Sequence, residues 1–174
     1  VPGVFEIKIE PNEEKEISFV CGFEENIEEI NLKDILKKEM ARTDELIEKT
    51  ELLNETSKLP KEKTELLTEL VKATDQFVVY RPSFGLHTVI AGYPWFLDWG
   101  RDTLISFEGL LLLTKRFDIA KEVLLTNIRD MKFGLVPNGY SGYDNRPLYN
   151  SADSSLLLIE QAYKYLKYTN DYEF

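Results

Sequence analysis

Residues 91–103, Ala-Gly-Tyr-Pro-Trp-Phe-Leu-Asp-Trp-Gly-Arg-Asp-Thr, concentrate the side chains of this chain that could do chemistry. They include both tryptophans, two carboxylates and the guanidinium of Arg101, which directly precedes Asp102. Aromatic faces pack against the CH groups of a sugar, and charged side chains bind its hydroxyls through charge-assisted hydrogen bonds. The pattern favours a sugar-binding site. The alternative is that the aromatics are core residues and that Arg101 and Asp102 form a structural salt bridge.

Two loops rich in glycine and aromatic residues, 80–102 and 134–150, are each followed by a strongly apolar stretch typical of a buried helix. Because both loops precede such a helix, we expect them to meet at one end of an array of helical hairpins. Asp102 and Asp153 would then lie at that end, where the loops form a concave site.

Apolar residues at helical spacing predict five helices, at residues 32–54, 60–79, 103–114, 118–131 and 152–168. Residues suited to begin these helices precede or open four of them: Asn31, Pro60, Asp118, and Asn150 or Ser151. Upstream, apolar and polar residues alternate in 4–10 and 15–21 around Pro11 and Asn12, which predicts a half-buried β-hairpin. The chain is therefore expected to be mainly helical.

Charge and aromatic residues are unevenly placed along the chain. The net charge is −10, and residues 1–75 carry 20 acidic and 11 basic side chains but only three of the 21 aromatics. The first part therefore resembles solvated surface, and residues 76–174 resemble core and site. No basic patch exists, which argues against nucleic acid.

Several targeting and cofactor features are missing from the sequence. Cys21 is the only cysteine, so no internal disulfide forms, as expected in a reducing compartment. There is neither a signal peptide nor a run of about 18 apolar residues, which predicts a cytoplasmic protein with no membrane span. No metal or other cofactor is implied. The chain begins Val-Pro-Gly, and we interpret it as a segment of a longer protein.

Five motifs occur in the order and spacing of glycogen debranching enzymes, in their C-terminal amylo-α-1,6-glucosidase domain. The segments that carry this resemblance are Thr74-Asp75-Gln76-Phe77, 91–96, Asp98-Trp99-Gly100-Arg101-Asp102-Thr103, 134–138 and 149–153. The resemblance covers residues 60–174. It implies an incomplete (α/α)6 toroid over that range, the end of an upstream β-domain in residues 1–24, and a linker helix in 25–59.

The resemblance also implies hydrolysis of α-1,6-linked branch glucose in glycogen or limit dextrin by an inverting mechanism with two carboxylates. Arg101 and Asp102 would grip hydroxyls of the glucose in the −1 subsite, with Asp102 as general acid being the alternative. The other substrate-binding candidates are the stacking aromatics Trp95, Phe96 and Trp99, and the polar residues Asn138, Asn150 and Asp153. For Asp153, direct substrate binding and support of neighbouring helices both remain open.

Two departures from the family pattern matter. Only about five helices fit in this chain, whereas the family barrel has twelve. No convincing acid and base pair is found, because Glu108 and Glu160 are predicted to lie on helices below the loops. The general acid and base are expected further along, so the segment by itself should be inactive.

Other functions fit the same residues. The chain could be a carbohydrate-binding module without catalysis, a purely structural helical array, or part of a glucoamylase-like or trehalase-like hydrolase with another linkage preference. The partner that the family resemblance implies is an α-glucan, glycogen or limit dextrin. Apolar helices that lack neighbours are also expected to make the segment self-associate.

Overall fold

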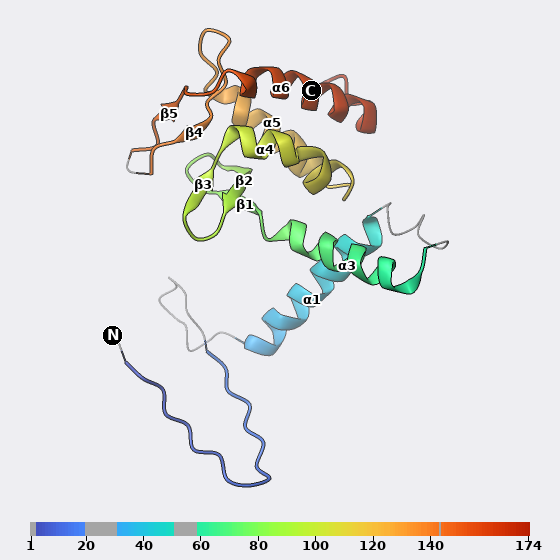
Figure 1. Ribbon diagram of the computed structural model, residues 1–174, viewed down its shortest axis with the longest axis vertical. Coiled ribbons are helices and arrows are strands. Elements are labelled where there is room, and N and C mark those ends of the chain that lie inside the picture. The colour runs from blue at the N-terminus through green and yellow to red at the C-terminus, as the bar shows by residue number, and fades with distance from the viewer. Residues whose placement is uncertain (1–2, 20–30, 51–58, 143) are drawn as a thin grey trace. The chain divides into compact units, whose positions relative to one another are not determined.

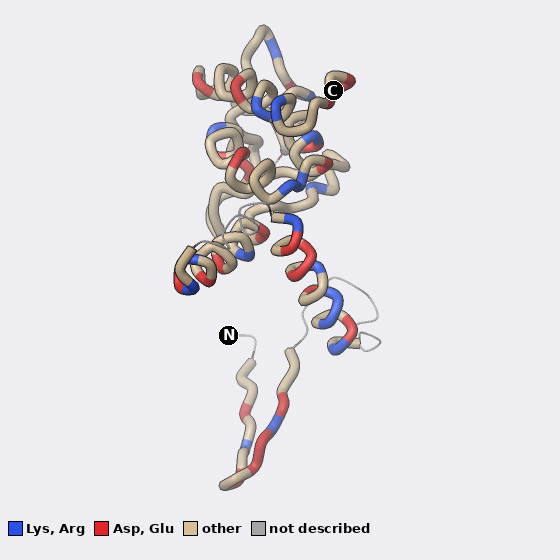
Figure 2. The backbone as a smooth tube through the Cα atoms, turned by 90° about the vertical axis from the view of Figure 1, so that its right-hand side faces the viewer, with Lys and Arg blue, Asp and Glu red and all other residues tan. Residues whose placement is uncertain are grey.

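The computed structural model describes residues 3–19, 31–50, 59–142 and 144–174 (Figure 1). They form two units, Val1–Ala41 and Arg42–Phe174. The described part is mainly helical, as expected, and no helix in it is long and apolar enough to cross a membrane. Acidic and basic residues are interspersed along its helices (Figure 2).

The N-terminal segment contains the predicted turn but not the predicted strands. Glu13 N donates to Glu10 O at 3.0 Å around Pro11 and Asn12, and the rings of Phe5 and Phe19 meet edge to face, with centroids 5.6 Å apart. Residues 3–10 and 13–19 nevertheless form no strand, so the β-hairpin prediction is wrong for the described residues. An isolated two-stranded hairpin is marginal in water, and these two rings remain 80% and 72% exposed.

Helices α1 (Leu32–Lys49) and α3 (Lys61–Asp75) begin where their caps predicted. Asp34 N donates to the Asn31 side-chain oxygen at 3.3 Å, and Pro60 precedes α3. The predicted end of the first helix, at residue 54, lies outside the described residues. The second helix ends at Asp75 rather than near residue 79, because the following β-branched residues enter a sheet.

The segment predicted as a loop, 80–102, is largely an antiparallel sheet in the order β1-β2-β3. Its strands are β1 (Val78–Arg81), β2 (Leu86–Gly92) and β3 (Phe96–Asp98). The prolines and glycines lie mainly in the turns between strands; Gly85, for example, has φ +68°. The sequence pattern was therefore that of short strands joined by tight turns, not of one long loop.

The core of the second unit lies between strand β2 and the helices that follow the sheet. Helix α4 (Gly100–Phe107) continues into a π-helical turn, η3 (Glu108–Leu112), and contacts α6 (Asp153–Thr169), which also contacts α5 (Phe117–Arg129). Figure 1 shows these helices beside the sheet. Their shared core consists of buried side chains, chiefly Val89, Leu104, Phe107, Leu111, Leu112, Val123, Leu124, Val136 and Leu158.

The starts of the last two helices differ in detail from the prediction. Helix α5 begins at Phe117, so Asp118 lies in its first turn and does not cap it, although an acidic residue there still favours the helix dipole. At α6, Ser154 N approaches the Ser151 hydroxyl oxygen at 3.4 Å, which is the interaction that the predicted cap would make. A second antiparallel sheet, formed by β4 (Gly139–Tyr140) and β5 (Pro147–Leu148), lies between α5 and α6 in the sequence.

The carboxylate of Asp75, at the end of α3, binds two arginines. Nη1 of Arg42 and Nη1 of Arg116 each lie 3.0 Å from Oδ1 of Asp75. The hydrogen bond from Arg42 holds the pKa of Asp75 below its ordinary value, against the opposing effect of partial burial. A carboxyl with a lowered folded-state pKa stabilises the fold above its unfolded pKa of about 4, and this stability is lost as the pH falls through the folded value.

We therefore expect Asp75→Asn to lower the free energy of unfolding at pH 7 by about 1–3 kcal/mol and to flatten its fall below pH 4. Urea unfolding at several pH values measures both effects. Asp144→Asn is the matched control, because Asp144 pairs with Arg146, whose side chain is 81% exposed, and should change stability by less than about 1 kcal/mol. Equal stability of wild type and Asp75→Asn at pH 7 would contradict the prediction.

Candidate functional site

The N-terminal ends of α4 and α6 meet through a polar network. Nε of Arg101 lies 3.0 Å from Oδ2 of Asp153. The side-chain oxygen of Asn138 accepts a hydrogen bond from Arg101 N at 3.1 Å, and its Nδ2 donates to Asn150 at 3.1 Å. The prediction that residues 91–103 and 138–153 converge at one end of the helices is confirmed.

The backbone at the start of α4 is fixed to the 137–139 segment. Trp99 forms an antiparallel bridge with Gly139, and Gly100 N donates to Asn138 O at 2.8 Å. A Cβ on Gly100 would lie 2.4 Å from Pro137 O, so only glycine permits this approach. The site residues that follow Trp99 are thereby held in register with the second loop.

A depression of about 280 Å³ lies beside this junction, lined by Ala91, Phe96, Trp99 and Asp102. Two predicted aromatics thus face the same hollow as a carboxylate. Trp95 is not among its lining residues and is 85% exposed. Asp102 also borders a second, more apolar depression of about 330 Å³ next to Phe77 and α4.

The charged residues of the motif are paired differently from the simplest sequence interpretation. Arg101 pairs with Asp153, so a structural salt bridge between Arg101 and Asp102 is not formed. Asp102 is exposed, and within the described part of the chain its carboxylate has neither a hydrogen-bond donor nor an ion-pair partner. A carboxylate in this state beside aromatic rings is able to accept hydrogen bonds from a ligand.

Asp153 is held as an anion at the start of α6. The Ser151 hydroxyl donates to its Oδ1, and this hydrogen bond, followed by the charge of Arg101, lowers the pKa of Asp153. The side chains of Arg101 and Asp153 remain 58% and 43% exposed, so the pair is accessible to a ligand. The pair therefore offers both a guanidinium donor and a carboxylate acceptor to adjacent hydroxyl groups of a ligand.

A second ion pair beneath the site was not singled out from the sequence. Nη1 of Arg81 donates to both carboxylate oxygens of Asp98, and the Thr88 hydroxyl adds a third hydrogen bond at 3.3 Å. The available signal was strand alternation, which places Arg81, Thr88 and Asp98 on one face once residues 78–98 are recognised as a sheet.

The remaining titratable candidates have structural partners. His87, the only histidine, lies on β2 with its Nδ1 2.6 Å from Oε2 of Glu122. Glu108 and Glu160 both lie 2.9 Å from Lys164 Nζ. No group of three or more His, Cys, Asp or Glu side chains is placed to hold a metal ion among the residues that the structure describes.

Comparison with known proteins gives the class to which this chain belongs. Residues 72–174, more than half of the chain, match the family described as amylo-alpha-1,6-glucosidase. The chain belongs to this family, which confirms the resemblance carried by the five motifs.

A curated relative gives a more particular similarity. The chain is 35% identical over 97 residues to the glycogen debranching enzyme of Saccharomyces cerevisiae. The alignment covers 53% of this chain and 6% of the yeast protein, so the chain spans only a small part of that relative's length. No solved structure matches the chain.

Proposed function

We propose that these residues form the sugar-recognition part of a glycoside hydrolase that releases α-1,6-linked branch glucose from glycogen or limit dextrin. The observation that carries the proposal is the depression in which Phe96, Trp99 and the unpaired carboxylate of Asp102 meet, next to the Arg101–Asp153 pair. Membership of the amylo-alpha-1,6-glucosidase family supports the same conclusion.

Each residue has a distinct role in this proposal. Phe96 and Trp99 stack on the glucose ring of the −1 subsite, and the exposed Trp95 is free to extend this wall when a longer glucan binds. Asp102 accepts hydrogen bonds from ring hydroxyls, and Arg101 donates hydrogen bonds to them. Asn138 accepts a hydrogen bond from the Arg101 backbone and is itself bonded to Asn150, and Asp153 pairs with the Arg101 side chain.

The chemical step belongs to residues outside the 174 of this chain. An inverting mechanism needs a protonated carboxyl for the glycosidic oxygen and a carboxylate that activates water on the opposite face. Glu108 and Glu160 are engaged by Lys164 and are unsuited to either role. In this proposal residues 60–174 are the first part of an (α/α)6 toroid, preceded by a linker helix at 25–59 and the end of a β-domain at 1–24.

The test is turnover of a branched limit dextrin by the complete protein that carries this chain. Trp99→Ala removes a ring that would be buried by substrate, and we expect KM to rise about 10–100-fold, equivalent to about 1–3 kcal/mol. Phe133→Ala is the matched control, because Phe133 is 93% exposed and lies outside the depression. An unchanged KM in Trp99→Ala would contradict the proposal.

The 174-residue chain by itself is expected to release no glucose from the same dextrin. Without the acid and base, it would lack the proton transfers that contribute about 10²–10⁴-fold each. Glucose release above that of a boiled sample would place the catalytic pair inside the chain. Dextrin binding by a complete protein that releases no glucose would instead identify a carbohydrate-binding module.

A further inference from the structure

The ion pair of Arg81 and Asp98 is buried where a salt bridge adds little net stability. The two side chains are 16% and 8% exposed. Removing such charges from water costs about as much as their attraction returns, so a pair of this kind is better explained by the geometry that it imposes.

Arg81 hydrogen-bonds to three residues through its planar guanidinium, two of them far away along the chain. Besides Asp98, it reaches Asn145 through Nη2 at 2.7 Å and Ser83 through Nε at 3.2 Å. Arginine can make these hydrogen bonds at the same time because its donors are fixed in a planar fork. The single ammonium group of lysine cannot replace this arrangement.

Aromatic rings hold the guanidinium in place. Its Cζ lies 4.1 Å from the centre of the Phe84 ring and 5.1 Å from that of Tyr140, and these two rings contact each other at 4.8 Å. Arg129 stacks on Phe84 at 3.7 Å, and the Tyr140 hydroxyl donates to Asp130 at 3.0 Å. The cluster thus connects β1 to the end of α5 and to β4.

The cluster grips both strands of the junction that carries the sugar site. Asp98 directly precedes Trp99, and Tyr140 directly follows Gly139, while Trp99 and Gly139 form the bridge between the two loops. Arg81 therefore contacts the sequence neighbour of each bridge partner: it pairs with Asp98 and stacks on Tyr140. Arg101 and Asp102 follow Trp99 within the first turn of α4.

We propose that Arg81 is a positioning residue of the sugar site: by binding Asp98 and stacking on Tyr140, it fixes the junction of Trp99 and Gly139 and hence the place of Asp102. This inference rests on the proposed function. It predicts that loss of Arg81 impairs catalysis in protein that is fully folded, because a displacement of about 1 Å in a site costs as much as 10²-fold.

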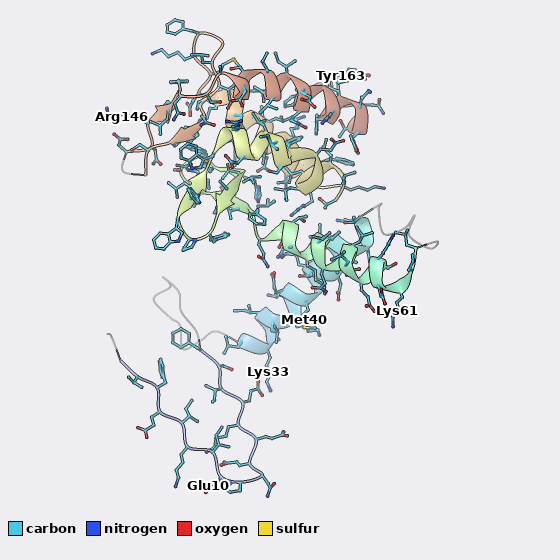
Figure 3. All side chains as sticks on the ribbon, viewed as in Figure 1. Glu10, Lys33, Met40, Lys61, Arg146 and Tyr163 are labelled. Atoms are coloured by element: carbon cyan, nitrogen blue, oxygen red, sulfur yellow. The ribbon has the colours of Figure 1, made fainter. Side chains whose placement is uncertain are left out.

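The experiment measures kcat and KM on branched dextrin with the complete protein, at a temperature where unfolding curves show each variant to be folded. Arg81→Lys and Arg81→Met should lower kcat/KM about 10–100-fold. Arg146→Met is the matched control and should have wild-type kinetics. Arg146 lies next to Asn145 in the loop between β4 and β5 (Figure 3), but it pairs with Asp144 and its side chain is exposed.

A double-mutant cycle with Asp102→Asn separates positioning from a merely structural role. If Arg81 acts through the placement of Asp102, Arg81→Met should cost little more once Asp102 has been replaced. Additive losses in the cycle would overturn the inference.

A further variant keeps the test valid if Arg81→Met does not fold. Arg81→Met combined with Asp98→Asn removes both charges, so no unpaired charge is left buried. This variant should fold and still show low kcat/KM, and wild-type kinetics in it would overturn the inference. Normal kinetics in the Arg81 variants, with losses in Trp99→Ala and Asp102→Asn, overturn the inference alone; no loss in any variant overturns the proposed function as well.

Discussion

Replacing Asp102 by asparagine is expected to lower kcat/KM of the complete protein about 10²–10⁴-fold on branched dextrin. The carboxylate lines the aromatic depression without a partner in the described chain, so its acceptor oxygens are available to substrate hydroxyls. Asparagine keeps the shape but replaces one acceptor by a donor. Each charge-assisted hydrogen bond contributes about 1.5–3 kcal/mol, and two of them strengthened in the transition state account for the expected loss.

A second substrate, α-glucosyl fluoride, distinguishes recognition from acid catalysis. Its leaving group needs little protonation, whereas both substrates must place the same glucose ring in the site. A recognition residue should therefore impair both substrates about equally. If Asp102→Asn spares the fluoride, Asp102 is the general acid and our assignment is wrong; if neither substrate is affected, the site lies elsewhere.

Asp153→Asn is the companion variant in this experiment. It removes the carboxylate that pairs with Arg101 at 3.0 Å, so it tests the other charged half of the network. Equal losses on both substrates would assign Asp153 to support of Arg101 or direct binding of the sugar. A loss confined to dextrin would assign proton donation to Asp153.

Gly100→Ala is expected to destabilise the fold by about 2–4 kcal/mol. The new Cβ would meet Pro137 O at 2.4 Å, and the obstacle is backbone that is itself bonded to the start of α4. Relief of this clash must separate Gly100 N from Asn138 O, which lie 2.8 Å apart in the native structure. Thermal or urea unfolding of the purified variant measures the loss.

Gly109→Ala is the matched control for this substitution. Gly109 is exposed in the π-helical turn, and a Cβ there would have no neighbour within 4 Å. Alanine is also the better helix former, so this variant should be unchanged or more stable by up to about 1 kcal/mol. Equal stability of Gly100→Ala and Gly109→Ala would show that the contact between the two loops is not tight.

Helices and their starts were largely readable from local pattern. Asn31 and Pro60 begin their helices as expected because capping depends on a few neighbouring residues. The sheet at 78–98 was missed because its strands are short and its turns carry the same glycines and prolines as a loop. The N-terminal strands failed for the opposite reason, since alternation alone does not supply a surface to pack on.

The sugar-binding candidates could be identified from the sequence, because the type of an aromatic or charged side chain and the motif around it indicate its chemistry. Their partners came only from the tertiary structure. Arg101 pairs with Asp153, 52 positions away, rather than with its neighbour Asp102, and Arg81 reaches Asp98 across the sheet. Which side chains form ion pairs depends on which backbone segments lie close together in space. The sequence does not show this, because it depends on the pairing of the strands and on the close contact of Gly100 with Pro137.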